Sequence, residues 1–324
     1  MLRDRYGRKI DYLRISVTDR CNLRCVYCMP ESGVIPKNPR ELLSFEEIEE
    51  VARAAISLGI NKIRITGGEP LVRRDLVSLI GNLSKIKLLS DLSITTNGTF
   101  LEDYARDLKE AGLHRVNVSL DTLNEEKYEF ITGSDGLRKA LQGVEKALQI
   151  GLSPVKVNMV VMKGINDDEI IDFVKLSYDK PVSVRFIEFM PFGRNLFWEE
   201  KRFIPISEVK AHCRSFAELL PADGLPGSGP ARYYRIKGGR GTMGFISPLS
   251  SPFCSRCNRL RLTSEGKLRP CLYSEKQIDL RKILRENASG EEIGSLIKLS
   301  VSNKPKEHYC GAVKVNRAMS QIGG

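Results

Sequence analysis

The chain has 324 residues, of which 41% are hydrophobic and 28% are charged. This composition excludes a disordered or fibrous protein, and no apolar run approaches the roughly 18 residues that a membrane-spanning helix needs. The 51 Lys and Arg against 40 Asp and Glu give a net charge of +11. Such a charge favours an anionic partner, which could be nucleic acid, a membrane surface or a phosphorylated small molecule.

The amino-terminal residues lack the apolar stretch of a signal peptide, so we expect a cytoplasmic protein. In that reducing compartment the eight cysteines are not expected to form a disulfide framework. Cysteines that cluster in such a protein indicate metal binding or catalysis instead.

From residue 12 to residue 191, short β-branched runs alternate with helical stretches. We expect strands at residues 12–18, 61–67, 91–97, 114–120, 154–162 and 181–189. Helices are expected between them, at residues 44–59, 75–86, 101–112, 136–151 and 167–178. This alternation predicts a parallel sheet, open or curled toward a barrel, with ligand-binding groups at the carboxyl ends of the strands.

The strand and helix alternation stops after Met190. Residues 221–232, PADGLPGSGPAR, are rich in Pro and Gly and are typical of a loop or domain junction. We therefore expect a barrel domain at residues 1–220 and a C-terminal module at residues 221–324, which begins with short strands and glycine turns.

Three cysteines follow the first expected strand with the spacing C-x3-C-x2-C: Cys21, Cys25 and Cys28. A structural zinc takes four N or S ligands, and none of the three histidines of the chain is near this loop. A 4Fe-4S cluster held by three cysteines keeps one iron without a protein ligand, and the amine and carboxylate of an amino acid could occupy it. A zinc site or a redox-inert loop is the alternative.

This loop resembles that of the radical S-adenosylmethionine (radical SAM) superfamily, where it follows the first strand of an incomplete (βα)6 TIM-type barrel. The resemblance implies reductive cleavage of S-adenosyl-L-methionine to methionine and a 5′-deoxyadenosyl radical. Residues 67–70, GGEP, end the second expected strand and resemble the superfamily's segment of that sequence, where glycine allows close backbone approach to a ligand. The implied contacts to S-adenosyl-L-methionine are Tyr27, Gly68, Ser119 and Met190, although Tyr27 also suits loop packing and Met190 suits a core.

A second set of cysteines has the spacing C-x2-C-x13-C and consists of Cys254, Cys257 and Cys271. Cys310, Cys213 or His308 could complete a zinc ribbon here, so zinc stays an alternative. The segment between these cysteines has a single acid, Glu265, and many cations, which are Arg256, Arg259, Arg261, Lys267 and Arg269. Arginine binds phosphate with two parallel hydrogen bonds, so this segment suits a nucleotide.

The whole chain, from DYLRISVTDRCN through TGGEPLVRRD and TTNG to the terminal QIGG, resembles the GTP 3′,8-cyclase family of molybdenum cofactor (molybdopterin) biosynthesis. The resemblance implies an α/β fold, an incomplete (βα)6 barrel whose C-terminal module carries a second 4Fe-4S cluster. It also implies that Gly323 and Gly324 join Cys21, Cys25 and Cys28 as catalytic residues, although a terminal glycine pair is ordinarily a frayed end. The implied GTP contacts are Arg14, Arg64, Thr95, Lys156, Arg259, Leu260 and Arg261, with Lys62 and Arg185 as further candidates.

The implied activity is that of a lyase that acts on GTP. The deoxyadenosyl radical removes the 3′ hydrogen of the ribose, and the carbon radical attacks C8 of guanine to give (8S)-3′,8-cyclo-7,8-dihydroguanosine 5′-triphosphate. Implied partners are an electron donor of the flavodoxin or ferredoxin type, a downstream cyclic pyranopterin monophosphate synthase and a second copy in a homodimer, with no nucleic acid and no membrane.

Two rival functions fit part of the sequence. A radical SAM peptide maturase with auxiliary clusters would need more C-terminal cysteines, and it would leave the arginines unexplained. A zinc-bearing nucleic-acid-binding protein would explain the charge, but it predicts complete four-ligand sites and aromatic stacking surfaces.

Overall fold

Six parallel strands form the centre of the computed structural model, which describes residues 1–30, 33–192, 197–222, 229–307 and 318–323. Each strand pairs in parallel with the next one along the chain. All six expected strands are thereby confirmed. They are β1 (Tyr12–Ser16), β2 (Lys62–Thr66), β3 (Asp91–Thr96), β4 (Arg115–Ser119), β5 (Val155–Val161) and β6 (Val182–Glu188).

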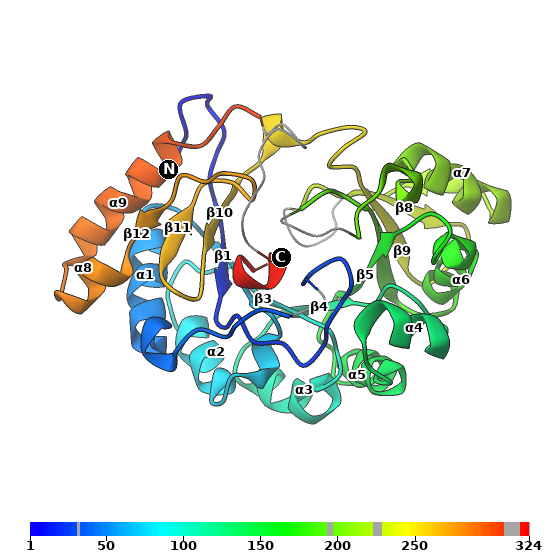
Figure 1. Cartoon of the computed structure of the whole chain (residues 1–324), viewed down its shortest axis with the longest axis horizontal. Coiled ribbons are helices and arrows are strands. Elements are labelled where there is room, and N and C mark those ends of the chain that lie inside the picture. Colours follow the sequence, from blue (N-terminus) through cyan, green and yellow to red (C-terminus); the bar gives the residue numbers. More distant parts are fainter. Residues whose placement is uncertain (31–32, 193–196, 223–228, 308–317, 324) are drawn as a thin grey trace.

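The helices that follow these strands cover the outer face of the sheet (Figure 1). The five expected helices are confirmed as α1 (Phe45–Ser57), α2 (Leu76–Ser84), α3 (Leu101–Glu110), α5 (Leu137–Gln149) and α6 (Ile170–Asp179). Ser44 begins α1 with a capping box: the N–H of Glu47 donates to Ser44 Oγ, and the N–H of Ser44 donates to the Glu47 carboxylate.

The sequence analysis missed α4 (Glu125–Thr132). The residues at its two ends could have indicated this helix. Asn124 is the N-cap, whose Oδ1 accepts a hydrogen bond from the N–H of Lys127, and Gly133 ends the helix at a φ of 67°. Short 3-10 helices occur at Pro39–Glu41, Pro70–Val72, Asp167–Glu169, Glu200–Arg202, Cys254–Arg256 and Met319–Gln321.

The later strands extend the same sheet at both edges instead of forming a separate sheet. β10 (Arg259–Leu262) pairs in parallel with β1, and β9 (Thr242–Ile246) pairs in parallel with β6. Antiparallel strands continue each edge, so the order is β12-β11-β10-β1-β2-β3-β4-β5-β6-β9-β8-β7. These outer strands are β11 (Lys267–Arg269), β12 (Ile278–Asp279), β8 (Arg232–Ile236) and β7 (Leu219–Pro221).

Three further helices lie outside the sheet: α7 (Ile206–Phe216), α8 (Arg281–Arg285) and α9 (Gly290–Ser302). α9 packs against α1, so a helix from the last part of the chain lies beside the first α-helix (Figure 1). Because strands from both sides of residue 221 share one sheet, the boundary that we expect there stays a prediction. Within the described residues no helix is long and apolar enough to cross a membrane.

Alternation along the strands separates the hydrophobic core from the interior of the open barrel. On β1, Leu13 and Ile15 are buried in the core against the helices, whereas Arg14 and Ser16 belong to the opposite face. The carboxyl-terminal 3-10 helix, drawn in red at the centre of Figure 1, lies within the opening of the barrel. The fold therefore encloses polar side chains on its inner face.

Candidate active site

Both sets of cysteines face one cavity of about 360 Å³ inside the barrel. The first set, Cys21, Cys25 and Cys28, lies in the loop after β1, and all three thiols are free and half-buried. Burial raises the pKa of Cys21 to about 11 and that of Cys28 to about 12. Without a metal these thiols stay protonated, so it is a bound iron cluster that would favour the thiolate form.

Two glycines of the GGEP segment give the cysteine loop room to pass. A Cβ on Gly68 would lie 2.3 Å from the carbonyl oxygen of Arg20, and one on Gly67 would lie 2.7 Å from that of Thr18. The N–H of Gly68 donates to this Thr18 oxygen over 2.8 Å. The predicted need for glycine thus has a second reason, which is contact with the protein's own backbone.

Glu69, the acid of this segment, is fully buried and connects β2 to the end of β3. Its carboxylate accepts hydrogen bonds from Thr96 Oγ1 and the N–H of Asn97, each over 2.7 Å, and from the N–H of Leu71 over 3.0 Å. Burial raises the pKa of Glu69 to about 7. Asn97 in turn donates to Asn22 in the cysteine loop, so Glu69 indirectly positions that loop.

Tyr27, Gly68, Ser119 and Met190, the predicted contacts to S-adenosyl-L-methionine, all line the cavity. The Tyr27 hydroxyl donates to the carboxylate of Asp121 over 2.5 Å, and burial raises the pKa of Asp121 to about 6. The sequence analysis did not single out Asp121, although its place just after β4 was a usable signal because ligand groups gather at such strand ends.

The second set of cysteines also forms part of the cavity wall. Cys254 and Cys257 belong to the turn before β10, and Cys271 follows β11. Burial raises the pKa of Cys257, but the charges of Arg259 and Lys304 outweigh it and lower this pKa to about 6. Cys257 is therefore largely a thiolate at neutral pH, which suits a metal ligand.

Neither set of cysteines, among the described residues, forms a site for a single metal ion. Among the described residues, no group of three His, Cys, Asp or Glu side chains is suited to hold one metal ion. A cubane spreads its thiolates over separate iron atoms, whereas zinc gathers its ligands around one centre. Cys213 is buried within α7 and is not part of the cavity wall, and Cys310 and His308 lie outside the described residues.

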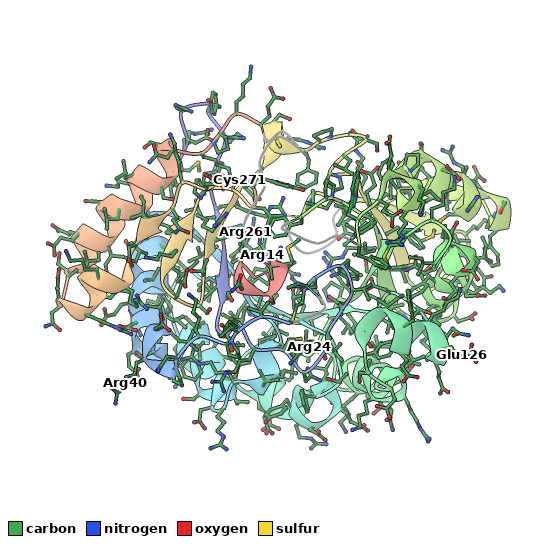
Figure 2. The ribbon with its side chains drawn as sticks, in the orientation of Figure 1. Arg14, Arg24, Arg40, Glu126, Arg261 and Cys271 are labelled. Carbon is green, nitrogen blue, oxygen red and sulfur yellow. The ribbon has the colours of Figure 1, made fainter. Side chains whose placement is uncertain are left out.

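Three arginines occupy neighbouring positions on adjacent strands between the two cysteine sets. Arg14 on β1 is in register with Arg261 on β10 and with Arg64 on β2. Burial, assisted by neighbouring arginines, lowers the pKa of Arg64 and that of Arg261 to about 10. Figure 2 shows Arg14 and Arg261 together in the interior below Cys271, whereas Arg40 and Glu126 lie at the periphery. Such a row of buried like charges is costly unless an anion neutralises it.

The predicted substrate residues divide into those that line the cavity and those that do not. Lys156 is not among the residues that line the cavity. It is nearly fully buried, and burial together with the charges of Arg185, Arg115 and Arg64 lowers its pKa to about 6. Lys62 forms an ion pair with Asp11 over 3.1 Å, and the Leu260 side chain packs in the core, so only the Leu260 backbone is available to a ligand. The cavity-lining residues of this set are Arg14, Arg64, Thr95, Arg185, Arg259 and Arg261.

The carboxyl-terminal segment lies between the two cysteine loops. The N–H of Met319 donates to the carbonyl oxygen of Cys28 over 3.2 Å, and Arg261 Nη1 donates to that of Gly323 over 2.6 Å. Gly323 has a φ of 73°, and a Cβ there would lie 2.7 Å from Thr66 Cγ2 and 3.1 Å from Ser16 Cβ. Only glycine fits this position without displacement. Gly324 lies outside the described residues.

Comparison with known proteins gives matches over the whole chain. A family model described as the radical SAM superfamily matches residues 15–177, and one described as Molybdenum Cofactor Synthesis C matches residues 182–310. A GTP 3′,8-cyclase of Pelotomaculum thermopropionicum is 50% identical over 100% of both chains. One of Syntrophomonas wolfei is 48% identical over 99% of both chains.

Solved structures share the fold at low sequence identity. The crystal structure of Streptococcus suis SuiB bound to S-adenosylmethionine aligns with a TM-score of 0.63 at 16% identity. The alignment covers 89% of this chain and 68% of SuiB. This likeness bears on the arrangement of strands and helices alone.

Proposed function

The chain belongs to the radical SAM superfamily and, within it, to the GTP 3′,8-cyclase family, and we propose that its cavity performs that family's reaction as a lyase. The protein converts GTP to (8S)-3′,8-cyclo-7,8-dihydroguanosine 5′-triphosphate, the first step of molybdenum cofactor biosynthesis. One observation carries this proposal: a single cavity has three cysteines in each of two wall regions and a row of buried arginines between them.

The first cysteine set would hold the 4Fe-4S cluster that the superfamily uses. Cys21, Cys25 and Cys28 would supply three soft ligands, and the cluster, once bound, would supply the electron that cleaves S-adenosyl-L-methionine. Tyr27, Ser119 and Met190 surround the place that this cofactor would take. Cys254, Cys257 and Cys271 would hold a second 4Fe-4S cluster on the GTP side of the cavity.

The buried cations bind the triphosphate of GTP. Arg14, Arg64 and Arg185 line the cavity. Their positive charges repel one another, and a bound polyanion would reduce this repulsion. Arg261 holds the carboxyl-terminal segment through Gly323 beside this site. The segment reduces access of water to the cavity, which protects a reactive radical.

The remaining partners follow from the same chemistry. The proposed electron donor is of the flavodoxin or ferredoxin type, and a cyclic pyranopterin monophosphate synthase would take the product. We also propose a homodimer. A peptide maturase is the weaker candidate because a peptide does not neutralise the row formed by Arg14, Arg64 and Arg261.

Two measurements test the proposed function. Protein purified without oxygen is expected to contain about eight iron atoms per chain, four for each cluster. When it is reduced and mixed with S-adenosyl-L-methionine, 5′-deoxyadenosine should form at a rate that depends on GTP. Colourless protein that holds zinc, or 5′-deoxyadenosine formation that ignores GTP, would overturn the proposal.

A further inference from the structure

A buried lysine lies beside the second set of cysteines and lines the same cavity. Lys304 follows α9 and is 2% exposed. Its Nζ donates to the carbonyl oxygen of Arg259 over 2.8 Å and to that of Pro270 over 2.6 Å. Arg259 comes two residues after Cys257, and Pro270 comes directly before Cys271. One ammonium group therefore joins the two chain segments that carry these cysteines.

Arg8 connects Cys254, the third cysteine of this set, to the residues that follow Lys304. Its Nη1 donates to the carbonyl oxygen of Cys254 over 2.7 Å and to that of Lys306 over 2.9 Å. Its Nη2 donates to Pro305 O over 2.6 Å, and its Nε pairs with Asp4 over 2.6 Å. Arg8 thus ties Cys254 to the residues just after Lys304, so the chain segments that carry the three cysteines all connect to residues 304–306.

Burial of the Lys304 ammonium group costs free energy that its two backbone hydrogen bonds do not fully offset. An ammonium group buried away from water is unfavourable, and two carbonyl oxygens replace only part of its hydration. The charge of Lys304 acts on the thiols of Cys257 and Cys271. A cluster on these thiolates would bring negative charge to the same place and offset the burial of the lysine.

We propose that Lys304 is a positioning residue for the second cluster: it holds Cys257 and Cys271 in place and supplies a positive charge that favours the reduced cluster. The inference rests on the proposed function, because it requires the second set of cysteines to hold a cluster. Lys304 touches neither GTP nor the reacting atoms in this role. It acts through the cysteine segments and through its charge.

The test uses the full chain with Cys21, Cys25 and Cys28 replaced by Ser, so that only the second cluster contributes. Lys304→Met removes the charge and both hydrogen bonds but keeps an unbranched side chain. Lys306→Met is the matched control, because Lys306 is exposed, lies two residues away and contributes only its backbone carbonyl to Arg8. Each protein is reconstituted with iron and sulfide without oxygen.

Lys304→Met is expected to release iron to a chelator about 10- to 100-fold faster than the control, the usual effect of losing a group that orients metal ligands. The reduction potential of its remaining cluster should become more negative, whereas a purely structural role would not move it. Equal release and equal potential in Lys304→Met and Lys306→Met would overturn this inference alone. If the parent chain takes up no iron, the second cluster is refuted and the inference with it.

Folding is checked in the chain that keeps all its cysteines. There, once the chelator has removed the second cluster, Lys304→Met should still hold about four iron atoms, those of the first cluster. Loss of both clusters would identify Lys304 as a general folding residue and overturn the specific role.

Discussion

Lys156 on β5 is the cation whose charge we expect GTP to change. Burial and the nearby charges of Arg185, Arg115 and Arg64 lower its pKa to about 6. At pH 7 only about one tenth of the ligand-free molecules therefore carry this proton. Burial is the larger cause and persists in the complex, but a triphosphate neutralises the surrounding arginines and raises the pKa of Lys156. Binding should then take up a fraction of a proton at Lys156, at most about 0.9.

The same shift sets the pH dependence of GTP affinity. Because the pKa of Lys156 is higher in the complex than in the free protein, the complex binds more protons between these two values. The contribution of Lys156 to affinity is full below about pH 6 and falls by up to about tenfold for each pH unit above it. Lys156→Met should weaken GTP binding and make it less dependent on pH.

Isothermal titration calorimetry measures the proton uptake directly. GTP is titrated at pH 7 into reconstituted, unreduced protein in two buffers that differ in enthalpy of protonation, and the difference gives the number of protons. Lys163→Met serves as control because Lys163 lies just after the same strand with its side chain 51% exposed. Protons exchanged by GTP itself cancel between variants. Equal uptake by the wild type and Lys156→Met would refute the reasoning.

Three further variants probe the contacts around the cavity. Gly68→Ala places a Cβ 2.3 Å from the Arg20 carbonyl oxygen, so the first cluster should be lost and the iron content should fall from about eight to about four atoms. The control Gly290→Ala, whose Cβ would meet no atom within 4 Å, should keep all its iron. Gly323→Ala and Arg261→Met each break the contact that seats the carboxyl-terminal segment. We expect each to lower GTP turnover at least about tenfold, and the double variant to be little worse, since the two residues act through one contact; fully additive losses would contradict this. Glu188 is a buried carboxylate that accepts hydrogen bonds from the N–H groups of Ile206, Leu249 and Ser250. In Glu188→Gln the new amide nitrogen is a donor that faces other donors, so hydrogen bonds are lost. The free energy of unfolding in urea should fall by about 2 kcal/mol, with the half-exposed Glu208→Gln as control, and equal midpoints would show that the contacts are unimportant.

The local pattern of the chain was enough to predict the parallel sheet and its ligand-bearing edge. The alternation of β-branched runs with helical stretches depends on residues close in sequence, and it identified all six central strands and five of their helices. The spacing of Cys21, Cys25 and Cys28 belongs to the same class of information, because three thiols within eight residues share one loop in any fold. The short α4 was missed because eight residues offer little periodicity.

Contacts between distant segments were decided by the tertiary structure alone. Nothing local in the sequence indicates that β10 joins β1, that β9 joins β6, or that Arg8 donates to the carbonyl of Cys254. Pairings of this kind depend on how the whole chain closes and on which buried polar groups remain to be satisfied once it has done so. The cysteines and arginines could therefore be chosen from their residue types and spacing, whereas the role of the buried Lys304 became visible only when the carbonyls of Arg259 and Pro270 met at its ammonium group.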